Sequence, residues 1–202
     1  MKYLTDFGDQ AVVLPLAAAI AIMLLVLGWW RGAIGWLLAV PGVLAVILSL
    51  KIIFYACHAE LPNLGIVSPS GHTASATVVY AGLLALLGKR GNAASRARMV
   101  RHLLLVALAA ILLAIIFGFS RVDLGMHTVP DVLVGGTVGI LGAVLFVVVA
   151  GQPPKGFRRW GLGAVVLLVA MLFHGRELHA EETIQRVAIS YWWPFIAACR
   201  HV

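Results

Sequence analysis

Long apolar runs separated by short polar segments fill most of the chain. A lipid bilayer offers no partners to backbone N–H and C=O groups, so runs of this kind predict helices that cross a membrane. We expect six such helices in one bundle, at residues 11–27, 33–50, 73–87, 103–119, 132–150 and 160–173. The predicted fold is therefore all-α: a polytopic membrane protein with a single embedded domain over residues 1–202.

The ends of these runs and the C-terminal tail should lie at the membrane surface. Several runs are shorter than the roughly 20 residues of a full crossing, so their ends should reach into the interface. The tail, residues 175–202, begins polar and becomes apolar. Its Trp192-Trp193-Pro194 stretch favours an interfacial or docked C-terminal helix over a seventh crossing.

The composition supports a membrane protein and argues against a soluble one. Hydrophobic residues make up 62% of the chain and charged residues 11%, whereas a soluble domain needs far more polar surface. We interpret the net charge of +7 as a topology signal and expect no nucleic-acid partner. Cys57 and Cys199 are too few for a disulfide framework; they are either two buried thiols or, in an oxidising compartment, one disulfide. The first run follows two aspartates without a basic lead-in, so we expect no cleavable signal peptide.

Charged residues divide unequally between the two sides of this arrangement. The loops after the first, third and fifth predicted helices share a side and carry none of the eight acidic residues. They carry nine of the fifteen basic residues: Arg31, Lys89, Arg90, Arg96, Arg98, Arg101, Lys155, Arg158 and Arg159. By the positive-inside rule that side is cytoplasmic. We therefore predict a bacterial inner membrane protein whose other side, with both termini, faces the periplasm or exterior.

Polar residues on that outer side could bind an anion. Lys51 closes the second run, and Arg121 precedes the fifth; an arginine offers a planar fork that fits phosphate oxygens. Ser70 and Gly71 open the third run, where free N–H groups and the positive end of a helix favour an anion. Ionisable groups at membrane depth are costly, so several at one level indicate a shared task.

Two histidines and a carboxylate complete a set that suits phosphoryl transfer. His127 and Asp131 are four residues apart, so the carboxylate can fix the imidazole tautomer and stabilise its positive charge. With a phosphate held between cations, His127 could attack phosphorus and His72 could protonate the departing oxygen. We expect no metal and no cofactor, because cations and helix-end donors can stabilise the transferring group.

These residues stand in two motifs, "PSGH" at residues 69–72 and "SR-x5-H-x3-D" at residues 120–131. Together they resemble the second and third motifs of the type 2 phosphatidic acid phosphatases, and the resemblance covers roughly residues 51–131. It implies a six-helix fold, a phosphohistidine on His127, Asp131 as its partner and His72 as general acid. The phosphate ligands that it implies are Lys51, Ser70, Gly71 and Arg121, with Ser120 as a further candidate.

The first motif of that family is incomplete in this chain. Its pattern is a lysine, six residues and then Arg-Pro, but His58 and Ala59 stand at the last two positions after Lys51. One phosphate-binding arginine is therefore missing. His58 is a tentative replacement that would carry charge only at lower pH, and Arg176 is another candidate for the role.

The sequence thus predicts a membrane phosphatase acting on the phosphate or pyrophosphate of a lipid at the outer face. Undecaprenyl pyrophosphate, phosphatidylglycerol phosphate and phosphatidic acid are candidate substrates. Two alternatives stay open: a phosphotransferase of the same fold that uses a lipid or sugar acceptor, and a transporter or lipid-phosphate binder without catalysis. The sequence does not predict the lipid, the acceptor or the oligomeric state.

Overall fold

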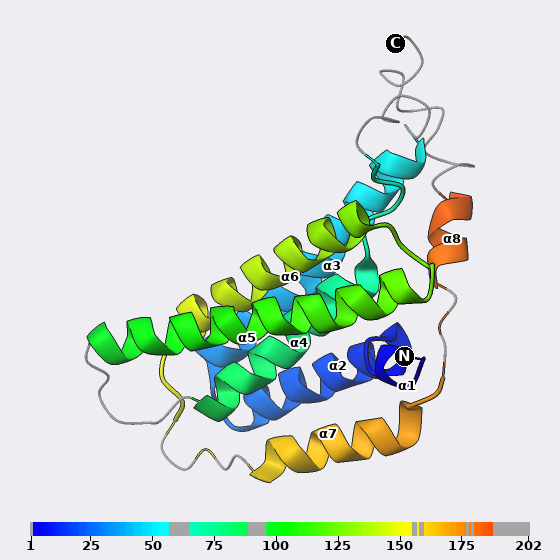
Figure 1. Ribbon diagram of the computed structural model, residues 1–202. Helices are drawn as coiled ribbons and strands as arrows, with labels where there is room; N and C mark the ends of the chain where they lie inside the picture. The colour runs from blue at the N-terminus through cyan, green and yellow to red at the C-terminus, as the bar shows by residue number, and fades with distance from the viewer. Residues whose placement is uncertain are drawn as a thin grey trace.

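The computed structural model describes residues 2–56, 65–88, 96–154, 157, 160–176, 178 and 180–187. Over these residues the regular structure is entirely helical (Figure 1). The helices are α1 (Lys2–Asp6), α2 (Gln10–Val26), α3 (Trp30–Ala56), α4 (Gly71–Gly88), α5 (Arg96–Asp123), α6 (Val129–Ala150), α7 (Trp160–Phe173) and α8 (Ala180–Val187). The all-α prediction is confirmed.

Four helices within the described ranges are long and apolar enough to cross a membrane: α3, α4, α5 and α6. The other two predicted crossings form α2, of 17 residues, and α7, of 14 residues, which are apolar but shorter. Each predicted run therefore lies in a helix of its own, and the count of six crossings stays a prediction.

Two helices extend well beyond their apolar runs. The second predicted run stops at residue 50, but α3 continues to Ala56 and carries Lys51 and Tyr55 in its last turns. The fourth stops at residue 119, but α5 continues to Asp123 and includes Arg121. Helical hydrogen bonds are local, so a helix can continue past its apolar run and carry polar residues to the membrane surface. Two predicted phosphate ligands are thereby fixed on helical backbone.

Helix α6 packs against α3, α4 and α5 (Figure 1). Its buried glycines make this close packing possible. A Cβ atom at Gly139 would lie 2.6 Å from the carbonyl oxygen of Ala74 in α4, and one at Gly135 would collide with the carbonyl oxygen of Ser70. The start of α4, with the PSGH motif, is consequently in contact with the beginning of α6, which carries the last residue of the other motif, Asp131.

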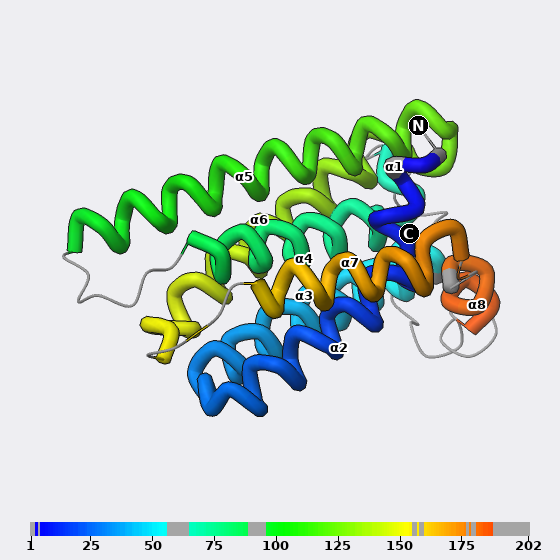
Figure 2. The backbone as a smooth tube through the Cα atoms, turned by 90° about the horizontal axis from the view of Figure 1, so that it is seen from below, coloured from blue at the N-terminus to red at the C-terminus, as the bar shows by residue number. Residues whose placement is uncertain are grey.

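The remaining helices flank this group. Helix α7 lies along α2 on the outside of the bundle (Figure 2). The α2 N-terminus is capped by Asp9, whose side chain accepts a hydrogen bond from the backbone N–H of Ala11 at 2.8 Å. Trp36 of α3 ties α2 in place by donating from its indole N–H to the carbonyl oxygen of Ala17 at 2.9 Å.

One end of the bundle gathers the polar residues of interest. Helix α8, the chain start and the C-terminal end of α3 lie at this end, opposite the N-terminal end of α5 with its arginines (Figure 1). Helix α8 corresponds to the start of the predicted interfacial helix; Trp192, Trp193 and Pro194 lie outside the described residues. Among the described residues, the arginines at the start of α5 and the carboxylates of α8 thus lie on elements at opposite ends of the bundle.

Candidate active site

The first turn of α6 is built around Asp131. Its Oδ2 accepts a hydrogen bond from the backbone N–H of Thr128 at 3.0 Å, while the Thr128 hydroxyl accepts one from the Asp131 N–H at 3.3 Å. This reciprocal capping box, with Pro130 in the first turn, fixes where α6 begins. It also holds the carboxylate in one orientation, 1% exposed.

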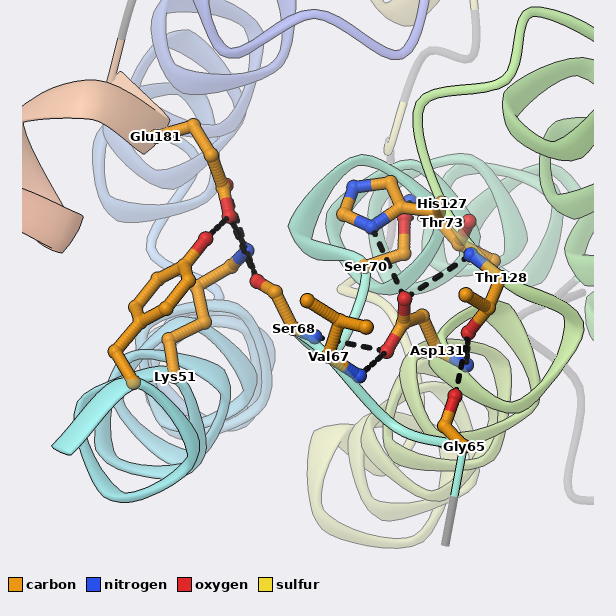
Figure 3. A network of polar contacts seen from close by, with 11 residues as sticks. Lys51, Gly65, Val67, Ser68, Ser70, Thr73, His127, Thr128, Asp131 and Glu181 are labelled. Atoms are coloured by element: carbon orange, nitrogen blue, oxygen red, sulfur yellow. Dashed lines mark hydrogen bonds and ion pairs between the residues drawn. The ribbon is translucent and has the colours of Figure 1, made fainter. Parts of the chain in front are cut away.

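The same carboxylate joins the two motifs. Oδ1 of Asp131 accepts hydrogen bonds from the backbone N–H groups of Val67, at 3.0 Å, and Ser68, at 2.9 Å (Figure 3). In return, the backbone N–H of Ser70 donates to the Asp131 carbonyl at 3.0 Å. The chain just before α4 is therefore positioned by the residue that the sequence predicts as the partner of His127.

His127 lies directly beside this carboxylate. Its Nδ1 is 3.7 Å from Asp131 Oδ2, longer than a hydrogen bond but close enough for the charges to interact. Figure 3 shows the other ring nitrogen turned away from Asp131. Burial, together with the positive charges of Lys51 and Arg121, lowers the His127 pKa from 6.5 to about 4. The imidazole is consequently neutral at pH 7 and keeps a lone pair available for attack.

Lys51 lies buried at the other side of the site and holds a carboxylate. Its Nζ donates to both oxygens of Glu181 in α8, at 2.5 and 2.6 Å, and to the hydroxyl of Ser68 at 2.8 Å. The hydroxyls of Ser68 and Tyr55 also donate to Glu181, the former at 2.7 Å (Figure 3). Burial alone would raise the Glu181 pKa, but the lysine charge and the hydrogen bonds outweigh it and lower the pKa to about 2.

These groups meet at a pocket of about 450 Å³. It is lined by Tyr55, Val67, Ser68, Arg121, Gly125, Met126, His127, Thr128, Asp131 and Glu181. The wall thus combines an arginine, a neutral histidine and hydroxyl donors, which suits an oxyanion bound next to a nucleophile. Within the described ranges, no group of three or more His, Cys, Asp or Glu side chains is arranged to hold a metal ion.

Comparison with known proteins identifies the family of the chain. The family model of the PAP2 superfamily matches residues 52–153, which is about half of the chain. The chain belongs to the PAP2 superfamily. The resemblance seen in the motifs is thereby confirmed.

Two curated relatives differ in how much of the chain they match. An uncharacterized 22.5 kDa protein in the cps region of Klebsiella pneumoniae is 27% identical over 197 residues, covering 93% of this chain and 89% of the relative. Phosphatidylglycerophosphatase B of Bacillus subtilis (strain 168) is 39% identical over 93 residues, covering 45% of this chain and 42% of the relative. No solved structure matches.

The PAP2 motif residues do not all face the pocket. Lys51, Arg121, His127 and Asp131 surround or adjoin it. Ser70 is fully buried, where its hydroxyl accepts hydrogen bonds from the Thr73 backbone and hydroxyl. Gly71 borders Lys51: a Cβ atom there would lie 3.6 Å from Lys51 Cε, an ordinary van der Waals contact.

Two other motif residues have partners on the N-terminal segment. His72 Nε2 lies 3.2 Å from Oδ2 of Asp9, and His72 is not among the residues that line the described pocket. Ser120 is fully buried; its hydroxyl accepts from Thr5 at 2.9 Å and donates to the Phe117 carbonyl at 2.8 Å. The proposed phosphate contact of Ser120 would need a different hydroxyl orientation, whereas Asp9 gives His72 a charged partner.

The incomplete first PAP2 motif is only partly visible. His58, Cys57 and Cys199 lie outside the described residues. Arg176, the other candidate for the missing arginine, places its guanidinium 5.7 Å from the ring centre of Phe173. Arg176 does not line the described pocket, so the geometry does not place it in the arginine's role.

Four polar residues at this site were not predicted from the sequence: Asp9, Tyr55, Ser68 and Glu181. Only Tyr55 had a usable signal, because it follows Lys51 by four residues and so shares its helix face. Asp9 and Glu181 reach the site from the two ends of the chain, and no local pattern reveals such contacts.

Proposed function

We propose that the protein hydrolyses a phosphate or pyrophosphate monoester of a lipid at the extracytoplasmic face of a bacterial inner membrane. The PAP2 family and the phosphatidylglycerophosphatase relative support a lipid phosphatase in a helical membrane protein. The observation that carries the reaction type is the buried, neutral His127, which has Asp131 at one nitrogen and shares a pocket with Arg121. A site at the end of an apolar bundle can receive a headgroup while lipid tails stay in the bilayer.

In the proposed first step, His127 attacks phosphorus and the bond to the leaving oxygen breaks. That oxygen takes a proton from His72, and Asp131 stabilises the positive charge that develops on His127. Lys51 and Arg121 stabilise the equatorial oxygens of the transferring group. In the second step, water attacks the phosphohistidine, the P–N bond breaks, His72 accepts the proton and inorganic phosphate leaves.

The relative's name suggests which lipid to assay first. It is called phosphatidylglycerophosphatase B, so phosphatidylglycerol phosphate leads the panel, followed by phosphatidic acid and undecaprenyl pyrophosphate. Purified protein should release phosphate from at least one of them, and His127→Ala should abolish release. His102→Ala is the matched control, because His102 lies near the start of α5 and is a neighbour of Gly88, the last residue of α4. The start of α5 lies at the opposite end of the bundle (Figure 1).

The intermediate can be trapped directly. A substrate carrying labelled phosphate, quenched at alkaline pH, should leave label on the wild-type protein and none on His127→Ala. Chromatography of the products separates hydrolysis from transfer: labelled inorganic phosphate indicates water as acceptor, whereas a labelled lipid or sugar ester indicates a phosphotransferase. A wild-type protein that releases no phosphate, forms no labelled ester and takes no label would reject the proposal.

The proposed orientation has its own experiment. The two native cysteines are first replaced, and Met126→Cys is then introduced in the pocket wall. This cysteine should react with a membrane-impermeant maleimide in spheroplasts, which are intact cells without their outer membrane. Arg98→Cys, near the start of α5, should react only after the membrane is permeabilised. The reverse pattern would place the site on the cytoplasmic side.

A further inference from the structure

The contact between α8 and α3 is built like an anion-binding site. Nζ of Lys51 and the hydroxyls of Tyr55 and Ser68 all point at one group, the Glu181 carboxylate. A lysine that is 3% exposed loses its hydration, so its charge needs an anionic partner close by. The carboxylate of Glu181 here stands in for any oxyanion with two oxygens that can accept from these donors.

The donors are fixed independently of Glu181. Lys51 and Tyr55 are four residues apart on α3, so they project from the same helix face. Ser68 is held by its backbone N–H, which donates to Asp131 at 2.9 Å, and its hydroxyl accepts from Lys51 at 2.8 Å. Tyr55 and Ser68 also line the pocket that contains His127. The donor set is therefore part of the catalytic end of the bundle rather than a surface contact of α8.

Glu181, by contrast, is only loosely enclosed. Its side chain is 44% exposed, and it comes from a helix of eight residues that contacts α3. A carboxylate carries one charge, whereas a phosphate monoester at pH 7 carries between one and two and offers three oxygens. A phosphate next to both Lys51 and Arg121 is therefore attracted more strongly by these cations than the Glu181 carboxylate is.

We propose that Lys51, Tyr55 and Ser68 form one oxyanion cradle for the substrate phosphate, and that Glu181 occupies this cradle until phosphate displaces it. The proposal rests on the phosphatase function above and adds two phosphate-binding residues and an internal competitor to it. Tyr55 supplies a donor on the helix that lacks the arginine of the first motif. The contact between α8 and the cradle then sets the phosphate concentration that is needed to displace Glu181.

Phosphate affinity tests the proposal without requiring turnover. Protection of the purified protein against thermal unfolding by inorganic phosphate gives the dissociation constant. If Glu181 occupies the cradle about nine-tenths of the time, Glu181→Gln should bind phosphate up to about tenfold more tightly. Glu182→Gln is the matched control: it removes the same charge from the next residue of α8, which is exposed.

Tyr55→Phe distinguishes a phosphate ligand from an anchor for α8. In the Glu181→Gln background, loss of a hydrogen bond to phosphate should weaken phosphate binding about tenfold. If Tyr55 served only to hold Glu181, Tyr55→Phe would instead tighten phosphate binding in the wild-type background and change nothing in the double variant. That result, or a Glu181→Gln protein no tighter than Glu182→Gln, would overturn the proposal.

Kinetics separate this proposal from the function on which it rests. With a lipid phosphate that the wild type hydrolyses, Glu181→Gln should lower KM without lowering kcat. Hydrolysis with unchanged KM in Glu181→Gln would reject the cradle but keep the phosphatase. The expected phosphate affinities in a protein that hydrolyses no lipid phosphate would keep the cradle and reject the phosphatase.

Discussion

Replacing Asp131 by asparagine tests both roles that the structure gives this carboxylate. One of its oxygens accepts from Val67 and Ser68, and the other accepts from Thr128 and faces His127 at 3.7 Å. An asparagine has only one acceptor oxygen, so its NH2 group must oppose at least one of these backbone N–H groups. A buried donor without a partner costs about 1–3 kcal/mol, and the remaining bonds lose their charge assistance. We expect Asp131→Asn to have a free energy of unfolding about 2–4 kcal/mol lower than that of the wild type.

The catalytic effect should be distinct from this destabilisation. Loss of the charge that stabilises the His127 imidazolium should lower kcat about a hundredfold, at the small end of acid–base effects, because 3.7 Å is longer than a hydrogen bond. Tryptophan fluorescence in detergent reports unfolding, and phosphate release reports kcat at a temperature where both proteins are folded. The control is Thr128→Ala, which removes the helix cap at a cost of about 0.5–2 kcal/mol but leaves the carboxylate.

Folded Asp131→Asn protein with kcat within threefold of wild type would refute the catalytic role. Equal losses of kcat in Thr128→Ala and Asp131→Asn would show that the first turn of α6, and not the charge, matters. Unchanged thermal unfolding in Asp131→Asn would refute the structural role. Each conclusion depends on a different measurement, so the two roles can be judged separately.

Three further predictions concern other parts of the site and bundle. Because its pKa is about 4, His127 should stay neutral down to about pH 5 and gain a proton only as the pH falls further. A histidine-selective NMR titration can check this, with the His127 signal assigned as the one that is lost in His127→Ala. A pKa near 6.5 for that signal would contradict the prediction. Asp9→Asn should keep the α2 cap but remove the charge beside His72, so kcat for a lipid phosphate should fall. The effect should be smaller on p-nitrophenyl phosphate, whose leaving group needs no proton, and equal losses on both substrates would indicate a structural effect. Gly139→Ala should destabilise the bundle by about 1–3 kcal/mol because of overpacking. Gly42→Ala is the control and should not, because no neighbouring atom lies within 4 Å of the added Cβ. Thermal unfolding of both variants tests this, and equal stability would argue against the close packing of α6.

The helices could be predicted because a membrane helix depends mainly on its own local sequence. A long apolar run needs no knowledge of distant residues to form a helix in lipid. The ends of α3 and α5 were placed too early, because polar residues such as Lys51 and Arg121 can remain helical once they find partners at the membrane surface. Apolar runs therefore located the helices but not their ends.

Site residues that stand in sequence motifs could be predicted. Site residues that the tertiary fold brings together from distant parts of the chain could not. His127 and Asp131 are four residues apart in the sequence, and this short separation was enough to predict that they are neighbours. Glu181 meets Lys51 across 130 residues, and Asp9 meets His72 across 63, which no spacing rule can reveal. The motif also does not say which members face the pocket, since Ser70 and Ser120 are buried by packing of the bundle.

The hydrogen bonds from Val67 and Ser68 to Asp131 have a consequence for biosynthesis. Domains form from the N-terminus onward as the chain is made, and Asp131 is synthesised more than 60 residues after the segment that it fixes. The polypeptide before α4 therefore has to wait for two further helices before its geometry is set. An insertion pathway that released the chain early would deliver helices without a working site, so maturation of activity should lag behind membrane integration.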